Sequence, residues 1–269
     1  LEAELPRLTT ALLGILQPQL AAPMPPLAIA RFEVDPTQGK LTTGFTLPRQ
    51  TSLFSATADD VICRFRTCYD VTLWPIRVIH AQIESPAQHE FLDSGNVAGV
   101  LRLRLKAEGT DFAELAADRL RFHINAGPIL ANTLYELVFA GVEQVAYLEA
   151  DGGRHVLQPD DAILPVGFEP EEAVLPGADR GHPGYRLLSE YFVFPEKFRF
   201  FDLKLPKFRH PGQEVDVLLL LSHQPRQRMA IEPDVFALGC TPVANLFSRL
   251  TEPLHVDQRL TEYRLVADY

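Results

Sequence analysis

Residues 183–203 read PGYRLLSEYFVFPEKFRFFDL and form the densest aromatic stretch of the chain. Seven of these side chains are Phe or Tyr, and each buried aromatic side chain removes roughly 150–250 Å² of surface from water. Charged residues between the rings give the stretch a polar side as well. We therefore expect it to anchor a core or an interface, and the first question is what this protein assembles with.

Two neighbouring rings in this stretch, Phe200 and Phe201, are interaction candidates. Adjacent side chains of a strand point to opposite faces, so at least one of the two is expected to face a second layer or a partner subunit. Core packing is the ordinary alternative for the block, with Tyr191, Phe194 and Phe198 directed inward. We expect Phe198→Ala to unfold the chain, and one of Phe200→Ala and Phe201→Ala to impair assembly while leaving it folded.

Composition excludes several classes of protein. The chain has 269 residues, 46% of them hydrophobic and 22% charged, which is ordinary for a globular protein with a sizeable core. A net charge of −10 argues against a nucleic-acid binder, because neutralising phosphates needs an excess of Lys and Arg. The apolar runs are far shorter than the roughly 20 residues of a membrane span, and no charged-then-apolar leader opens the chain. We expect a cytoplasmic protein that does not insert into a membrane.

Side-chain patterns typical of catalysis are missing from the sequence. The eight His residues form no HxxxH or HxH pair, no Ser lies in a G-x-S-x-G elbow, and no Gly-rich loop matches a phosphate cradle. Adjacent acids such as Asp59 and Asp60 point apart in a strand or are solvated in a turn. The three Cys residues lack zinc spacing. We expect neither an enzyme nor a metal or cofactor site.

The chain opens with a short amphipathic helix. Leu5, Leu8, Leu12 and Leu16 recur at helical spacing over residues 5–16, and a run rich in Pro follows up to residue 26, where it forbids further helix. A helix of about three turns is too short to be stable alone in water. We expect its Leu stripe to be exposed in this chain and to seek a partner, so these four residues are interaction candidates.

A second set of interaction candidates comes from two stretches of strict alternation, 101–106 and 119–124. If the two strands are neighbours, their basic side chains share one outward face on an acidic protein. Such a face either docks an acidic partner and steers its association or is solvated and paired with nearby acids. The basic candidates are Arg102, Arg104, Lys106, Arg119 and Arg121.

The remaining pattern predicts an α+β fold that is rich in β-strands, mainly antiparallel, with a few helices and the short N-terminal helix. We expect a hairpin between 61–65 and 71–79, a helix over 128–139 opened by Pro128, and a hairpin between 142–149 and 155–158. Further strands are predicted at 27–34, 216–222, 243–247 and 263–266. The predicted division is the helix end and Pro-rich linker 1–26, a first α+β domain 27–159, a linker 160–182 rich in Pro, Gly and acids, and a second β-rich domain 183–269.

Three stretches resemble one known family. They are Cys63–Pro75 (CRFRTCYDVTLWP), Ile163–Pro170 (ILPVGFEP) leading into the aromatic block, and Leu238–Phe247 (LGCTPVANLF) followed by Glu262–Val266 (EYRLV). They resemble TssF, the VasA or ImpG family of type VI secretion baseplate proteins, in order and spacing as well. The resemblance covers nearly the whole chain, whereas the family's members are about twice as long, so we expect an internal fragment.

This resemblance implies a structural role in the baseplate wedge, on which the contractile sheath assembles around the inner tube, as in phage baseplates. It implies contacts with TssG, TssE, TssK and a second TssF copy, around the VgrG spike hub, in a cytoplasmic baseplate docked at the inner-membrane complex. The alternative from the residues alone is a carbohydrate-binding module or carbohydrate-active β-sheet enzyme, suggested by sheets, aromatics and scattered acids. Trp74, the only Trp of the chain, lies in a strand pattern, which weakens that alternative.

Overall fold

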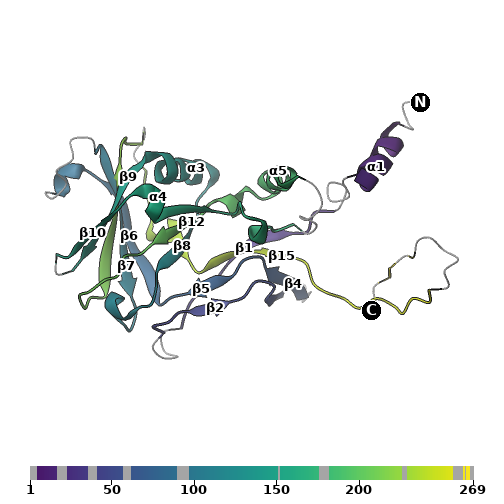
Figure 1. Cartoon of the computed structure of the whole chain (residues 1–269), viewed down its shortest axis with the longest axis horizontal. Coiled ribbons are helices and arrows are strands. Elements are labelled where there is room, and N and C mark those ends of the chain that lie inside the picture. Colours follow the sequence, from purple (N-terminus) through teal and green to yellow (C-terminus); the bar gives the residue numbers. More distant parts are fainter. Residues whose placement is uncertain are drawn as a thin grey trace.

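The computed structural model describes residues 5–16, 23–35, 41–56, 62–89, 97–150, 152–175, 182–225, 229–256, 263, 265 and 266. Every strand pair among them is antiparallel, and helices are few and short (Figure 1). The predicted α+β class is confirmed, including the N-terminal helix α1 (Leu5–Leu16).

A five-stranded sheet with the order β10-β9-β13-β7-β6 forms one outer layer. Its central strand carries the run Val217–Leu221, which is buried on both faces because its odd-numbered side chains enter the main core and its even-numbered ones enter a small outer cluster. The strands are β6 (Ile76–Glu84), β7 (Gly99–Ala107), β9 (Val142–Glu149), β10 (Arg154–Leu157) and β13 (Glu214–Leu221).

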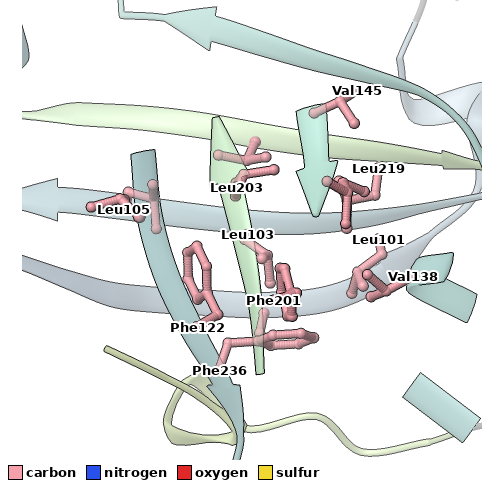
Figure 2. Packing of buried hydrophobic residues seen from close by; sticks show 14 of the residues in the cluster. Leu101, Leu103, Leu105, Phe122, Val138, Val145, Phe201, Leu203, Leu219 and Phe236 are labelled. Atoms are coloured by element: carbon pink, nitrogen blue, oxygen red, sulfur yellow. The ribbon is translucent and has the colours of Figure 1, made fainter. Parts of the chain in front are cut away.

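A four-stranded sheet with the order β11-β12-β8-β14 forms the middle layer. The main core lies between it and the five-stranded sheet, where the Leu and Val side chains of β7, β9 and β13 meet Phe122, Phe201 and Phe236 (Figure 2). Helix α3 (Pro128–Glu136) and the π-helical turn after it, Leu137–Gly141, close this core. The middle strands are β8 (Arg119–Ile124), β11 (Ile163–Val166), β12 (Phe200–Lys204) and β14 (Phe236–Leu238).

Two smaller sheets complete the fold. The sheet β1-β15-β4-β3 packs Ala244 and Cys240 against the second face of the middle layer, where Phe200 lies. A two-stranded sheet joins β2 and β5. Their strands are β1 (Leu27–Arg31), β2 (Phe45–Leu47), β3 (Ser52–Ala56), β4 (Ile62–Thr67), β5 (Val71–Leu73) and β15 (Cys240–Ala244).

Local predictions from alternation and turn signals are largely confirmed. The helix at 128–139 is α3 with the π turn, and β9 and β10 form the predicted hairpin. The predicted strands at 27–34, 216–222 and 243–247 correspond to β1, β13 and, shifted toward the N-terminus, β15. The strand predicted at 263–266 is not found at residues 263, 265 and 266, which have irregular backbone, and residue 264 lies outside the described residues.

Pairing over long distances in sequence overturns three predictions. The hairpin between 61–65 and 71–79 is wrong, because β4 pairs with β3 and β15 while β5 pairs with β2. The first part of the predicted linker 160–182 is wrong, because it forms α4 (Pro159–Ala162) and β11, which pairs with β12. The proposed separation of 27–159 from 183–269 does not divide the sheets, since β12 pairs with β8 and β13 lies between β7 and β9.

The side chain of His123 in β8 allows a test of the packing on the second face of the middle layer, where Phe200 lies. Its ring lies 4.5 Å from the ring of Phe200, and burial lowers the pKa of His123 from 6.5 to about 4. The unfolded chain takes up a proton near pH 6.5, whereas the folded chain keeps His123 neutral. The free energy of unfolding is therefore not reduced by His123 above pH 6.5. As the pH falls to 4, protonation of His123 in the unfolded chain lowers the free energy of unfolding by about 3 kcal/mol. Urea unfolding of wild type and His123→Leu from pH 7 to 4 measures the difference. A slope over that range that is the same in both proteins would contradict this assignment.

Candidate protein–protein interface

The basic candidates do not share a face, because β7 and β8 belong to different sheets. On the outer face of the five-stranded sheet, Arg102 and Arg104 both bond to Asp216, at 2.7 Å each for the shortest contacts. Burial by itself raises the pKa of Asp216, but hydrogen bonds from Arg104 and Arg102 lower it below the ordinary value. Lys106 lies at the end of the same strand, opposite Glu214. The expectation of one basic docking face is therefore wrong, and paired charges take its place.

The other two basic candidates lie on the middle layer. Arg121 makes a two-pronged contact with Asp202, at 2.7 and 2.9 Å, and its guanidinium lies 6.0 Å from the ring centre of Tyr69. Arg119 reaches the same carboxylate at 3.8 Å. A planar fork on a buried carboxylate is strong and specific, so Arg121 holds β8 to β12.

Phe200 and Phe201 do face opposite sides of β12, as alternation predicts, but both are fully buried. Phe201 stacks on Phe122 at 5.2 Å in the main core, and Phe200 packs in the cluster that joins the middle layer to β15. Each ring therefore faces another layer of the same chain. The expectation that one of them serves a partner subunit is wrong, because strands distant in sequence cover both faces.

The exposed part of the aromatic block lies on a helix that the sequence analysis does not predict, α5 (Pro183–Val193). His182 caps its N-terminus by accepting a hydrogen bond from the Gly184 amide, and Pro183 takes the first turn, where Pro is favoured. The helix ends before Pro195. Its outward side carries four large exposed side chains, Tyr185, Leu188, Tyr191 and Phe192, which we name the α5 aromatic face.

This face contradicts the inward packing predicted for Tyr191, whereas Phe194 and Phe198 are buried as predicted. Phe192 is 80% exposed. The spacing of residues 185, 188 and 192 is the helical i, i+3, i+7 pattern, and it is the signal that would have revealed the helix. Large exposed apolar patches mark sites of protein contact.

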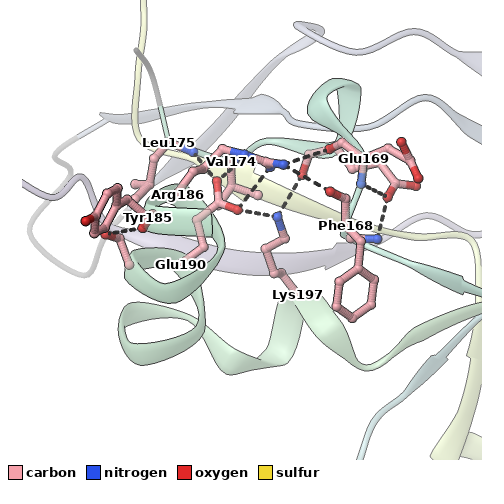
Figure 3. Close-up of polar contacts among 11 residues, drawn as sticks. Phe168, Glu169, Val174, Leu175, Tyr185, Arg186, Glu190 and Lys197 are labelled. Atoms are coloured by element: carbon pink, nitrogen blue, oxygen red, sulfur yellow. Dashed lines mark hydrogen bonds and ion pairs between the residues drawn. The ribbon is translucent and has the colours of Figure 1, made fainter. Parts of the chain in front are cut away.

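The inward side of α5 is polar, which is the reverse of an ordinary surface helix. Glu190 is fully buried and forms an ion pair with Lys197, which is also fully buried (Figure 3). The second carboxylate oxygen of Glu190 accepts hydrogen bonds from the amides of Val174 and Leu175, at 2.9 and 3.1 Å. Because its inward side is fixed by charge, α5 presents its aromatic side to solvent.

One more cation, Arg186, and three backbone carbonyls complete this network. Lys197 donates to the carbonyl of Glu172 at 2.9 Å, and Arg186 donates to the carbonyls of Phe168 and Glu169 at 3.0 and 3.3 Å. Burial lowers the pKa of Lys197, with the charge of Glu190 opposing that shift. Each buried charge thus has a partner, as low-dielectric surroundings require.

Gly167 allows the loop to approach this network. Its φ is +108°, and a Cβ there would lie 2.8 Å from the carbonyl oxygen of Lys197. A larger residue would therefore meet both strain and a clash. This explains the Gly within the Ile163–Pro170 stretch.

Helix α1 carries a second exposed apolar surface, which projects away from the sheets in Figure 1. Leu8, Leu12 and Leu16 are all exposed, as predicted, with Leu12 at 48%. The side chain of Leu5 lies outside the described residues. The role of the four Leu residues in binding remains a prediction.

Within the part of the chain that the structure describes, no group of three or more His, Cys, Asp or Glu side chains is placed to hold a metal ion. No helix there is long and apolar enough to span a bilayer.

Comparison with known proteins gives consistent matches. The family model for the type VI secretion system protein TssF matches residues 1–269. The type VI secretion system component TssF1 of Pseudomonas aeruginosa is 30% identical over 279 aligned residues, which cover 100% of this chain and 45% of TssF1.

The fold is also found in a cryo-electron microscopy structure of the TssK-TssF-TssG baseplate subcomplex of the type VI secretion system. One of its chains matches with a TM-score of 0.79 at 23% identity, over 94% of this chain and 47% of that one. The chain thus spans about half the length of the relatives that it matches. Because the family model matches along the whole sequence, this chain belongs to the TssF family of the type VI secretion system.

Proposed function

We propose that this chain is part of a structural subunit of the type VI secretion baseplate wedge, which scaffolds sheath and tube assembly through protein–protein contacts and carries no catalytic function. The family match along all 269 residues is the observation that carries the proposal. The exposed apolar sides of α1 and α5 support it, since they are surfaces suited to contacts with other subunits.

TssG and TssK are the first partners in this proposal, because a chain of the same fold is found in a TssK-TssF-TssG subcomplex. Contacts with TssE, a second TssF copy and the VgrG hub follow from the family resemblance alone. The same holds for a cytoplasmic baseplate docked at the inner-membrane complex.

The carbohydrate alternative rests on sheets, aromatics and scattered acids alone. Trp74, the only Trp of the chain, is half-buried and packs against the main core, so it offers no exposed platform for a sugar ring. Nothing in the comparisons favours a carbohydrate-active protein.

Co-expression tests the proposal. We expect the tagged chain to co-elute with TssG and TssK of the same organism in size-exclusion chromatography. A folded chain that elutes alone at every partner concentration would contradict the proposed assembly.

Leu12→Asp is expected to weaken that complex while leaving the melting temperature of the chain alone nearly unchanged. The side chain is exposed in the free chain, whereas an Asp buried without a counter-charge at an interface is costly. Ile129→Asp is the matched control, because Ile129 is an exposed apolar residue of α3. Equal co-elution of wild type and Leu12→Asp would remove α1 from the interface.

A further inference from the structure

Charged side chains border the α5 aromatic face. They indicate the chemistry of its partner more specifically than the exposed apolar area does. Phe168 and Tyr191 are exposed, and their rings lie on either side of the buried ring of Phe198, with centres 5.2 and 5.9 Å from it. Phe168 lies in the loop before the turn Pro170–Glu172, so these three rings join that loop to α5. The loop and the helix therefore form one surface.

Among the described residues, the exposed charges along this surface are acidic. Glu169 and Glu171 are exposed on the loop, and Glu196 is half-exposed just after α5. The two basic side chains that the structure describes in this region, Arg186 and Lys197, are turned inward and bound to Glu190. Burying these cations leaves an aromatic surface with a negative border.

We infer that the α5 aromatic face binds a basic amphipathic helix of another protein. Its apolar stripe would pack on Tyr191 and Phe192, and its flanking Lys or Arg side chains would face Glu169 and Glu171. Helix-in-groove and helix-on-helix recognition uses apolar anchors at i, i+3, i+4 and i+7, and complementary charges at the rim set register and association rate.

Two other occupants fit the charges less well. A second copy of this chain brings the same acidic border and a net charge of −10, so the two copies repel each other at this site. An anionic bilayer surface is repelled for the same reason. The inference goes beyond the proposed baseplate role, because it concerns the chemistry of the bound segment and stands whichever protein supplies it.

The probe is a fluorescein-labelled helical peptide of Leu and Lys, with Leu at i, i+3, i+4 and i+7, and its matched counterpart has Glu in place of Lys. Fluorescence anisotropy with the whole chain measures the affinity of each. We expect the Lys peptide to bind at least about tenfold more tightly than the Glu peptide, because Glu169 and Glu171 select charge. The double variant Glu169→Lys/Glu171→Lys is expected to reverse that preference.

Phe192→Ser is expected to weaken binding of the Lys peptide about 30-fold, the effect of losing one aromatic anchor. Ile129→Ser is the matched control, since Ile129 is 87% exposed on α3, and it should bind like wild type. Both changes are at the surface, so unchanged melting temperatures show that the variants are folded.

Three results overturn the inference. Equal affinities of wild type and Phe192→Ser would mean that the Lys peptide binds the acidic chain without using this face. Equal affinities for the Lys and Glu peptides would mean that charge does not select the partner. A dimer in sedimentation experiments that Phe192→Ser abolishes would assign the face to a second copy. None of these readouts depends on TssG or TssK, so failure of the baseplate proposal is recognised separately.

Discussion

Phe201→Ala is expected to lower the free energy of unfolding by about 3–5 kcal/mol, the usual effect of removing a buried ring. Phe201 lies at the centre of the main core, stacked on Phe122 and edge-on to Phe139 and Phe236, both at 6.4 Å. The loss is a large share of the stability of a typical domain. Chemical denaturation followed by circular dichroism measures it.

Phe192→Ala is the matched control for that experiment, because it removes the same ring from a side chain that is 80% exposed. We expect it to change the free energy of unfolding by less than about 0.5 kcal/mol. Phe200→Ala should resemble Phe201→Ala, since its ring is buried in the cluster behind the middle layer. Similar stabilities for Phe201→Ala and Phe192→Ala would contradict the placement of the main core.

Lys197→Met is expected to destabilise the protein by about 3–5 kcal/mol, because it leaves the buried carboxylate of Glu190 without its principal counter-charge. Arg186 remains, but its contact with Glu190 is long, at 3.4 Å. The free energy of unfolding measured by urea titration gives the size of the effect.

The double variant Lys197→Met/Glu190→Gln separates the effect of the ion pair on stability from the effect of side-chain packing. The carbonyl oxygen of the introduced amide side chain would still accept the hydrogen bonds of the Val174 and Leu175 amides, and a neutral replacement of both partners is often tolerated. We expect the double variant to recover much of the stability lost in Lys197→Met. A double variant less stable than either single variant would show that the ion pair is not what fixes α5.

The alternation of side chains predicts which segments are strands, but it does not predict which of those strands pair. The alternation of 101–106 and 119–124 predicts two strands correctly, but it carries no information on which strands pair. Arg102 and Arg121 therefore end in different sheets, each bound to an acid more than 80 residues away in sequence, Asp216 and Asp202 respectively. Because these acids come from strands that are distant in sequence, the predicted docking face is replaced by side chains that form ion pairs within the chain.

For α5, the prediction of the local structure itself is wrong. Aromatic residues favour strands and cores, and the sequence places this stretch in a β-rich domain. Yet Glu190 in the helix and Lys197 just after it are fully buried, whereas Phe192 is exposed. Buried charges are rare unless they are paired, and the pairing with Val174, Leu175 and Glu172 forms only in the folded chain. The spacing of residues 185, 188 and 192 indicates the helix, but no local pattern of hydrophobicity predicts that it buries its charges and exposes its rings.

In the function that we propose, the layered core holds exposed helices, α1 and α5, that contact other baseplate subunits. Hydrogen–deuterium exchange of the chain alone and mixed with TssG and TssK tests it most directly, because exchange reports local protection of backbone amides. We expect that amides of α1, α5 or both exchange more slowly in the mixture, while those of β7, β12 and β13 exchange at the same rates as in the chain alone. Identical exchange in every segment at saturating TssG and TssK would contradict it.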